Sequence, residues 1–227
     1  PFMTKFKNLH TENYYDSFSD VYAAIWSNQM HTGYFDREKS LDRACEDMNF
    51  HLAKEAGIKP NSVVLNIGCG RGGADRFLIK NFDCKVIGID ISQKQLDEAV
   101  MAAQGEGMQD AVKYMKAFMT ELPVDDDSID CIWVQESLFH CHEKDKAIGE
   151  FYRVLKSDGT VVLEDTVLMD PKAKKEVMDA FGKRVKINDI FTPDDYEKLF
   201  GEKGFKLAKK EDMTKHLEKT YVEIAKF

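Results

Sequence analysis

The chain has 227 residues, of which 43% are hydrophobic and 32% are charged, the balance of an ordinary globular domain. Its formal net charge of −8 argues against nucleic acid as a partner. No apolar run approaches the ~20 residues of a membrane-spanning helix, and the first residues lack the apolar core of a secretory signal. We therefore expect a cytoplasmic protein with neither a nucleic-acid nor a membrane partner.

Metal binding is not expected from the cysteines or the acidic residues. The five cysteines include no pair with C-x-x-C spacing, so neither a zinc site nor a redox dithiol is indicated. The consecutive aspartates Asp125, Asp126 and Asp127 occupy a polar turn and are interpreted as solvated side chains. The sequence thus predicts no metal site.

The first 57 residues are predicted to form a helical lid. Residues 8–36 are rich in aromatic side chains with partly helical spacing. Residues 38–56 carry the apolar stripe of an amphipathic helix, and Gly57 ends it. We assign residues 1–57 to the lid and residues 58–227 to the core domain.

The core domain alternates between apolar, β-branched runs and helical patterns. The predicted parallel strands are 62–67, 85–89, 112–116, 129–134 and 160–163. The predicted helices are 75–81, 92–105, 144–155, 171–184 and 194–201. Two closing strands are expected at 205–209 and 221–225, paired antiparallel at the sheet edge. The expected fold is α/β: a doubly wound, mainly parallel, seven-stranded Rossmann-like sheet with an antiparallel edge strand.

A glycine-rich turn follows the first predicted strand. Gly68, Gly70 and Gly73 satisfy the dinucleotide pattern G-x-G-x-x-G, and Asp90 ends the next strand at the distance suited to ribose hydroxyls. These residues alone fit NAD and S-adenosylmethionine equally well. They are also compatible with a tight turn and a helix cap that bind no ligand.

Four ordered motifs resemble the class I S-adenosylmethionine-dependent methyltransferases. Residues 64–70 resemble the V-L-D-I-G-C-G motif, and residues 88–92 resemble G-x-D-x-S. Residues 120–130 resemble the segment around the fourth strand, and residues 153–159 resemble the R-V-L-K-P-G-G turn. Residues 14–34 and 136–140 are similar to the sarcosine and dimethylglycine N-methyltransferases and to the tocopherol-type C-methyltransferases.

This resemblance implies S-adenosylmethionine as cofactor and S-adenosylhomocysteine as product. Gly68 and Gly70 would border the methionyl part, and Asp90 would hold the ribose. Asn66 and Phe118 depart from the family, which usually has Asp at both positions. The cofactor set implied by the resemblance is Tyr15, Gln29, Gly33, Asn66, Gly68, Cys69, Gly70, Asp90, Ile91, Phe118, Met119 and Gln135.

The acceptor side is predicted from the polar and aromatic residues near the same strand ends. His140, Tyr34 and His31 are the candidate general bases, and His140 and Tyr34 are the predicted catalytic residues. The candidate substrate-binding residues are Trp26, His31, Glu136 and His140. For each of them a purely structural role remains the alternative: a lid anchor for Tyr34 and Trp26, and a surface carboxylate for Glu136.

The expected function is methyl transfer to a small-molecule acceptor, with an amine as the first choice. C- or O-methylation of a small metabolite is the first alternative. A non-catalytic protein that binds the cofactor on the same fold is the second, and an NAD-dependent reductase is the third. The cap after the fifth strand is short, so a homodimer is one way to complete the pocket.

Overall fold

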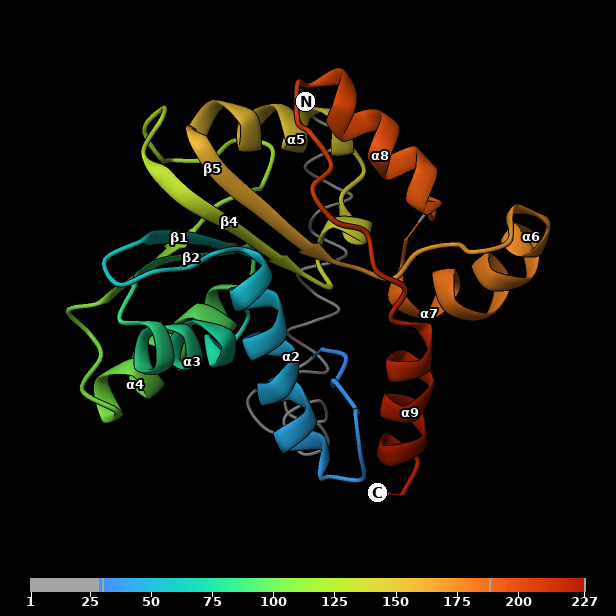
Figure 1. The fold of residues 1–227 in the computed structure, drawn as a ribbon, viewed down its shortest axis with the longest axis horizontal. Helices are drawn as coiled ribbons and strands as arrows, with labels where there is room; N and C mark the ends of the chain where they lie inside the picture. Colours follow the sequence, from blue (N-terminus) through green and yellow to red (C-terminus); the bar gives the residue numbers. More distant parts are fainter. Residues whose placement is uncertain (1–28, 30, 188, 227) are drawn as a thin grey trace.

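The computed structural model describes residue 29, residues 31–187 and residues 189–226. The predicted contributions of Tyr15 and Trp26 therefore lie outside the described residues. Within them, five parallel strands form one sheet in the order β3-β2-β1-β4-β5 (Figure 1). The strands are β1 (Val63–Ile67), β2 (Lys85–Asp90), β3 (Val112–Lys116), β4 (Ile129–Gln135) and β5 (Leu155–Glu164).

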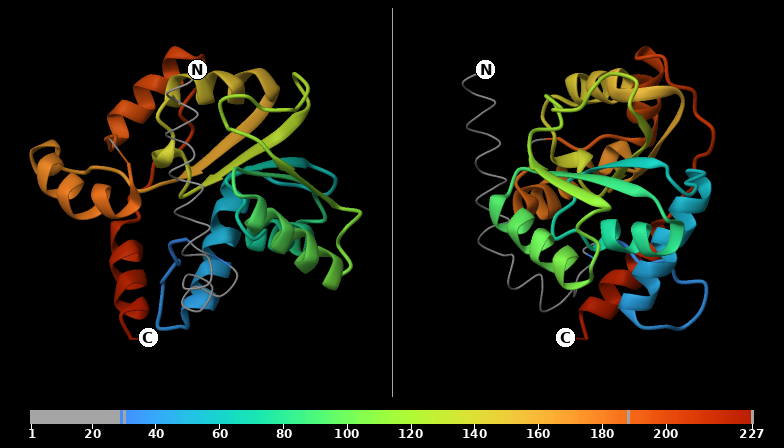
Figure 2. Two further views of the ribbon diagram at one scale, coloured as in Figure 1. Left: turned by 180° about the vertical axis from the view of Figure 1, so that it is seen from behind. Right: turned by 90° about the vertical axis from the view of Figure 1, so that its left-hand side faces the viewer.

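Helices cover both faces of this sheet, as expected for a doubly wound fold. The helices α2 (Leu41–Glu55), α3 (Gly73–Phe82) and α4 (Gln93–Gly105) lie on one face, and α5 (Lys144–Val154) and α8 (Pro193–Glu202) lie on the other (Figures 1 and 2). The predicted cap is confirmed at α4, where the Ser92 side chain accepts a hydrogen bond from the Gln95 N–H.

The core consists of two apolar layers, one on each face of the sheet. Met48 of α2, Leu78 of α3 and Trp133 of β4 are fully buried on one side. Ile132 of β4, with Ile148 and Phe151 of α5, is fully buried on the other. Because helices cover both faces of the sheet, the central strands are nearly continuous runs of apolar residues. This is the sequence pattern from which these strands were predicted.

Strand order reverses between β1 and β4, which are neighbours in the sheet but far apart in the chain. The register pairs Ile67 with Ile89 of β2 on one side and with Val134 of β4 on the other. The carboxyl ends of these strands therefore meet at one edge. In parallel sheets, ligands bind outside this edge at the point of reversal.

The two predicted closing strands are absent from the described residues, and the prediction of seven strands with an antiparallel edge is wrong there. Residues 205–209 form no ladder with any described strand. Residues 221–224 belong to helix α9 (Thr214–Ile224), which begins where Asp212 accepts a hydrogen bond from the Thr214 N–H. Leu217, Tyr221 and Ile224 recur at helical spacing, and this period overrides the local β-branched composition.

The predicted helix at 171–184 is present but interrupted. It consists of a 3₁₀ turn at Pro171–Ala173, α6 (Lys174–Val177), a π-helical turn at Met178–Gly182 and α7 (Lys183–Val185). Phe181 and Val185 pack against Phe139, which follows β4, so this short cap rests beside the carboxyl edge of the sheet. Among the residues that the structure describes, no helix is long and apolar enough to cross a membrane.

Candidate functional site

The turn between β1 and α3 brings backbone groups close to the carboxyl edge. Gly68 and Gly70 have φ angles of +76° and +54°, a region in which side chains are strained. A Cβ atom on Gly68 would lie 2.6 Å from the Cβ atom of Ser137. The sequence thus needs glycine here for two reasons: its positive φ and the close approach of the segment after β4.

Asp90 ties this turn to the end of β2. Its Oδ2 atom accepts a hydrogen bond from the Gly70 N–H, and its Oδ1 atom accepts one from the Ser92 N–H, both at 2.9 Å. The side chain remains partly exposed. Each carboxylate oxygen has a further lone pair, so Asp90 is held rigidly while still able to accept hydrogen bonds from ribose hydroxyls.

Asn66 is directed toward α3. Its Nδ2 atom donates to Asp75 Oδ1 at 2.6 Å, and both side chains are buried. Burial raises the pKa of Asp75 to about 6, although the hydrogen bond from Asn66 opposes the shift. A carboxyl group is thus present beside position 66, on the first turn of α3. Sequence reasoning missed Asp75, whose signal was an acidic residue inside an otherwise apolar helix face.

Three residues of the predicted cofactor set follow the ends of β2 and β3. Ile91, Phe118 and Met119 are all partly exposed. The Ala117 N–H donates to the Asp90 carbonyl at 3.1 Å, which brings the segment after β3 alongside the end of β2. Cys69 has a different environment: its side chain is buried, and burial raises the pKa of its thiol well above the usual value. Cys69 is therefore a neutral packing residue.

A chain of amide side chains links Gln135 to the lid side of the site. Gln135 Nε2 donates to Asn49 Oδ1 at 3.2 Å, and Asn49 Nδ2 donates to Gln29 Oε1 at 2.5 Å. Gln29 Oε1 also lies 3.2 Å from His31 Nε2. The structure thus brings together three predicted residues through Asn49, which the sequence reasoning missed. Asn49 is fully buried, and the only sequence signal was its polar character on the inner face of α2.

Residues 31–36, termed the 31–36 segment, run between α2 and α9. The Gly33 N–H donates to Thr220 Oγ1 at 3.0 Å, and the Phe35 N–H donates to His216 Nδ1 at 2.9 Å. The Tyr34 ring stacks between the rings of His51 and His216, with centroid distances of 4.8 and 4.3 Å. This stacking gives Tyr34 an anchoring role, the alternative that the sequence left open.

Carboxyl groups gather where β4 and β5 end. Glu136 has a φ angle of +46°, and its Oε1 atom accepts the Thr32 N–H at 2.9 Å and the Thr32 hydroxyl at 2.6 Å. Its side chain also shares a hydrogen bond with Glu164. Tyr196 of α8 donates to Asp165 Oδ2 at 2.8 Å. We call Glu136, Glu164 and Asp165 the carboxyl cluster.

His140 lies in a short 3₁₀ turn, Leu138–His140, beside this cluster. Lys144 holds the turn because its Nζ atom donates to the carbonyl oxygens of Phe139 (3.2 Å) and Cys141 (2.7 Å). Burial lowers the pKa of His140 to about 3, and burial also lowers the pKa of His31 to about 4. Both imidazoles are therefore neutral at pH 7 and are weak proton acceptors.

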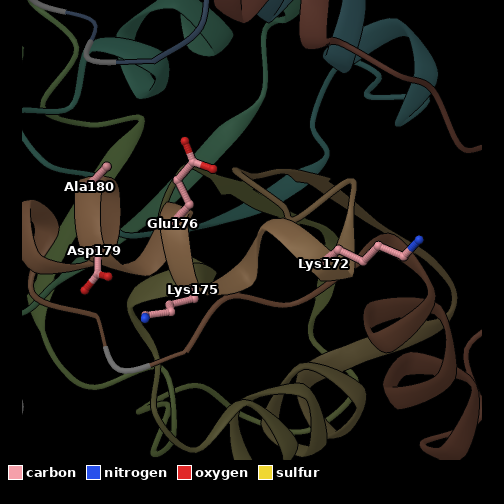
Figure 3. A pocket seen from close by; sticks show the side chains of 5 residues that line it. All are labelled: Lys172, Lys175, Glu176, Asp179 and Ala180. Atoms are coloured by element: carbon pink, nitrogen blue, oxygen red, sulfur yellow. The ribbon is translucent and has the colours of Figure 1, made fainter.

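A separate hollow lies on the cap. Its lining residues are Lys172, Lys175, Glu176, Asp179 and Ala180 (Figure 3). The Lys172 and Lys175 side chains extend away from each other in this view. Their mixed charges and solvent exposure make this a solvated surface, distinct from the glycine turn and the carboxyl cluster.

Comparison with known proteins agrees with this geometry. Residues 65–163 match the methyltransferase domain family. The chain is 30% identical over 215 residues to the (+)-O-methylkolavelool synthase of Herpetosiphon aurantiacus, covering 92% of this chain and 75% of that protein. The chain belongs to the class I S-adenosylmethionine-dependent methyltransferases. The predicted family is therefore confirmed, and its cofactor is S-adenosylmethionine.

Other relatives of this methyltransferase differ in length and in the reaction that they are named for. It is 32% identical to a sterol 24-C-methyltransferase of Gibberella zeae over 70% of its own length, but it spans only 42% of that protein. In fold, it resembles a putative sarcosine dimethylglycine methyltransferase of Galdieria sulphuraria. That match has a TM-score of 0.82 and 24% identity, and it covers 92% of this chain and 83% of the other.

The residues around the glycine turn suit the family's cofactor. The positive φ angles of Gly68 and Gly70 set the path of the turn, and the partly exposed Asp90 carboxylate is fixed by two N–H groups. Gln29 and Gln135 offer amide groups on the lid side of the same edge. The donor and acceptor types required by a ribose and an amino-acid moiety are thus present.

Proposed function

We propose that this methyltransferase transfers the methyl group of S-adenosylmethionine to a small-molecule acceptor, and that this acceptor is an amine. One observation supports this most directly: the cofactor residues Gly68, Gly70 and Asp90 share the carboxyl edge with Glu136 and His140. An acceptor held by the latter residues would face the cofactor across the β1–β4 reversal.

The chain's own contribution is positioning. The cofactor's sulfonium supplies an activated methyl group when it is bound, so the protein must align the acceptor and exclude water. Asp90 fixes the ribose and the glycine turn fixes the methionyl end. The 31–36 segment and the cap cover the site, while the neutral His140 ring offers a hydrogen bond to an acceptor.

The amine is preferred because acidic side chains dominate the acceptor side. Relatives are named for C-methylation and for an O-methyl product, and these acceptor chemistries are the alternatives. We also retain, as proposals, a lid formed by residues 1–57, a cytoplasmic location and a homodimer that completes the short cap. Phe118 and Asn66 belong to the cofactor side in this proposal.

An acceptor screen with methyl-labelled S-adenosylmethionine tests the proposal. Sarcosine, dimethylglycine and simple primary and tertiary amines would be compared with phenols, and formation of S-adenosylhomocysteine would be measured. We expect turnover with at least one amine, and its loss in His140→Ala. Turnover with phenols alone would exclude N-methylation, and cofactor binding without any turnover would favour a non-catalytic role.

A further inference from the structure

The carboxyl cluster contains more acidic groups than the methyl-transfer site described above requires. Glu164 is the last residue of β5 and Asp165 follows it, while Glu136 follows directly on β4, the strand hydrogen-bonded to β5. The Glu136 N–H donates to the Glu164 carbonyl at 2.7 Å, which fixes the two backbones side by side. Three carboxyl groups are thereby gathered at two adjacent strand ends.

The hydrogen bond between the Glu136 and Glu164 side chains requires a proton. Two carboxylates both lack a donor hydrogen, so one of the pair is a carboxylic acid when they are in contact. Thr32 supplies two donors to Glu136 and its side chain also interacts with Glu164, while the Tyr196 hydroxyl and the Phe139 N–H stabilise the Asp165 carboxylate. These donors stabilise part of the cluster's negative charge, but not the charge of all three groups.

Two oxygens of the cluster have no hydrogen-bond partner among the described residues. They are Glu164 Oε2 and Asp165 Oδ1, and the Glu164 side chain belongs to a residue that is only 9% exposed. Lys144 is the cation that lowers the pKa of Asp165 electrostatically, but its ammonium group donates hydrogen bonds to two carbonyl oxygens. An unpaired buried carboxyl oxygen is costly, and such groups occur where a ligand completes the pairing.

We propose that the carboxyl cluster is a cation site for the acceptor, in which a substituted ammonium group takes the place of the shared proton. This proposal rests on the proposed function and deepens it by assigning the acceptor to the class of organic cations. Glu136 and Asp165 are partly exposed and present the site to the ligand, whereas Glu164 lies behind them. Glu164 and Asp165 thus join Glu136 as specificity-determining residues.

The protonation states of the neighbouring groups agree with this assignment. Burial raises the pKa of Asp165 to about 8 and that of Glu164 well above its usual value, in part because each feels the other acidic groups. His140, by contrast, is too weakly basic to take a proton from an ammonium group. A carboxylate of the cluster therefore accepts the acceptor's N–H proton. The freed lone pair forms the N–C bond while the C–S bond breaks, and its electron pair stays on sulfur.

Displacement of a proton can be measured without knowing the natural acceptor. Choline is a suitable probe because it carries a permanent charge and has no titratable proton near neutral pH. Its control is the uncharged alcohol in which carbon replaces the nitrogen. Calorimetric titrations of the S-adenosylhomocysteine complex at pH 7, in two buffers of different ionisation enthalpy, give both the affinity and the number of protons released.

We expect choline to bind at least tenfold more tightly than the uncharged alcohol and to release up to one proton per site. Glu164→Gln should abolish the proton release. Glu136→Gln removes the other partner of the shared proton, so it should also abolish the release and replaces Glu164→Gln in the test if that variant does not fold. Glu176→Gln, the same change on the exposed surface of α6, should leave both quantities unaltered. Equal binding of the two probes, binding without proton release, or absence of choline binding would overturn the proposal.

The cofactor serves as the reference that separates the two proposals. Wild type, Glu164→Gln and Glu176→Gln should all bind S-adenosylmethionine with the same affinity, because Glu164 lies outside the cofactor set. If the folded wild-type protein does not bind S-adenosylmethionine, the proposed function fails. If cofactor binding is intact but choline releases no proton, only the cation site fails.

Discussion

The two halves of the site are stabilised in opposite ways. On the cofactor side, the Asp90 carboxylate accepts hydrogen bonds from two backbone N–H groups, and the buried Asp75 accepts one from Asn66. On the acceptor side, the carboxyl cluster combines a strained backbone at Glu136 with unpaired oxygens on Glu164 and Asp165. The first half is preformed by local structure, whereas the second retains free energy that a ligand can recover.

Replacing Gly68 with alanine should produce the largest effect on the cofactor side. The new Cβ would lie 2.6 Å from the Cβ of Ser137 at a φ of +76°. Strain of about 1–3 kcal/mol is expected, together with a loss of S-adenosylmethionine affinity of roughly tenfold to 100-fold or more. Calorimetric titration and thermal unfolding measure the two effects.

The matched control for this change is Gly107→Ala. Gly107 has a similar φ of +71°, but a Cβ there meets no atom within 4 Å. Gly107→Ala should lose only the stability that the positive φ costs, and it should keep the wild-type cofactor affinity. Equal affinities in the two variants would show that the turn at Gly68 does not approach the cofactor.

Asp90→Asn should give the next largest effect. An amide has one acceptor oxygen, so it cannot accept hydrogen bonds from both Gly70 and Ser92 and still bind a ribose. Charge-assisted hydrogen bonds contribute about 1.5–3 kcal/mol, which corresponds to a roughly tenfold to 100-fold weaker Kd for S-adenosylmethionine. Asp97→Asn on the exposed side of α4 should leave the Kd unchanged, and a similar Kd in both variants would contradict the role of Asp90.

Asp165→Asn tests the acceptor side and should act in the stabilising direction. Because the folded-state pKa of about 8 lies above the usual 3.8, the folded protein binds the extra proton between these values. The contribution of this group to the free energy of unfolding is therefore fully present below pH 4, and it is lost as the pH rises toward 8. The variant should melt ~2–8 °C higher than the wild type at pH 8.5, the shift expected for about 1–2 kcal/mol.

The difference between Asp165→Asn and the wild type should shrink as the pH falls to 5, where the wild-type carboxyl is protonated in the folded state. Thermal unfolding at pH 5, 7 and 8.5 checks this trend. Asp125→Asn, in an exposed turn, should show no such pH dependence. A variant less stable than the wild type at pH 8.5 would mean that the Asp165 charge is compensated in the folded protein.

The smallest effect is expected at the junction of the 31–36 segment with α9. Thr220→Val leaves the Gly33 N–H without its acceptor at a fully buried position. A cost of about 1–2 kcal/mol in the free energy of unfolding follows. Thr220→Ser keeps the hydroxyl and should retain most of the wild-type free energy of unfolding. If the serine variant is as unstable as the valine variant, the loss of stability comes from packing and not from the hydrogen bond.

The sequence predicted the cofactor side well because its constraints are local. The run from Val63 to Ile67, the glycines, Asp90 and the Ser92 cap each have a short-range signature, and all are found where predicted. The carboxyl cluster could be predicted only in part from the sequence. Glu136 was singled out, but its pairing with Glu164 depends on which strand lies beside β4, and a single sequence does not state this.

The errors at the C-terminal end have the same origin. Residues 205–209 have the composition of a strand, but a strand exists only where a neighbour completes its hydrogen bonds, and no described strand does so. In α9, His216 and Thr220 lie on the face that meets the 31–36 segment, and these contacts stabilise a helix there. Asn49 and Asp75 were not predicted from the sequence, because each is identified only by a tertiary hydrogen bond: Asn49 with Gln135 and Gln29, and Asp75 with Asn66.

The most direct test is a calorimetric titration of the full chain with S-adenosylmethionine and with S-adenosylhomocysteine. We predict one site per chain and micromolar affinity for both, with weaker binding in Asp90→Asn and unaltered binding in Glu164→Gln. Absence of binding to a folded wild-type chain would contradict the assignment of the glycine turn and Asp90 as the cofactor site.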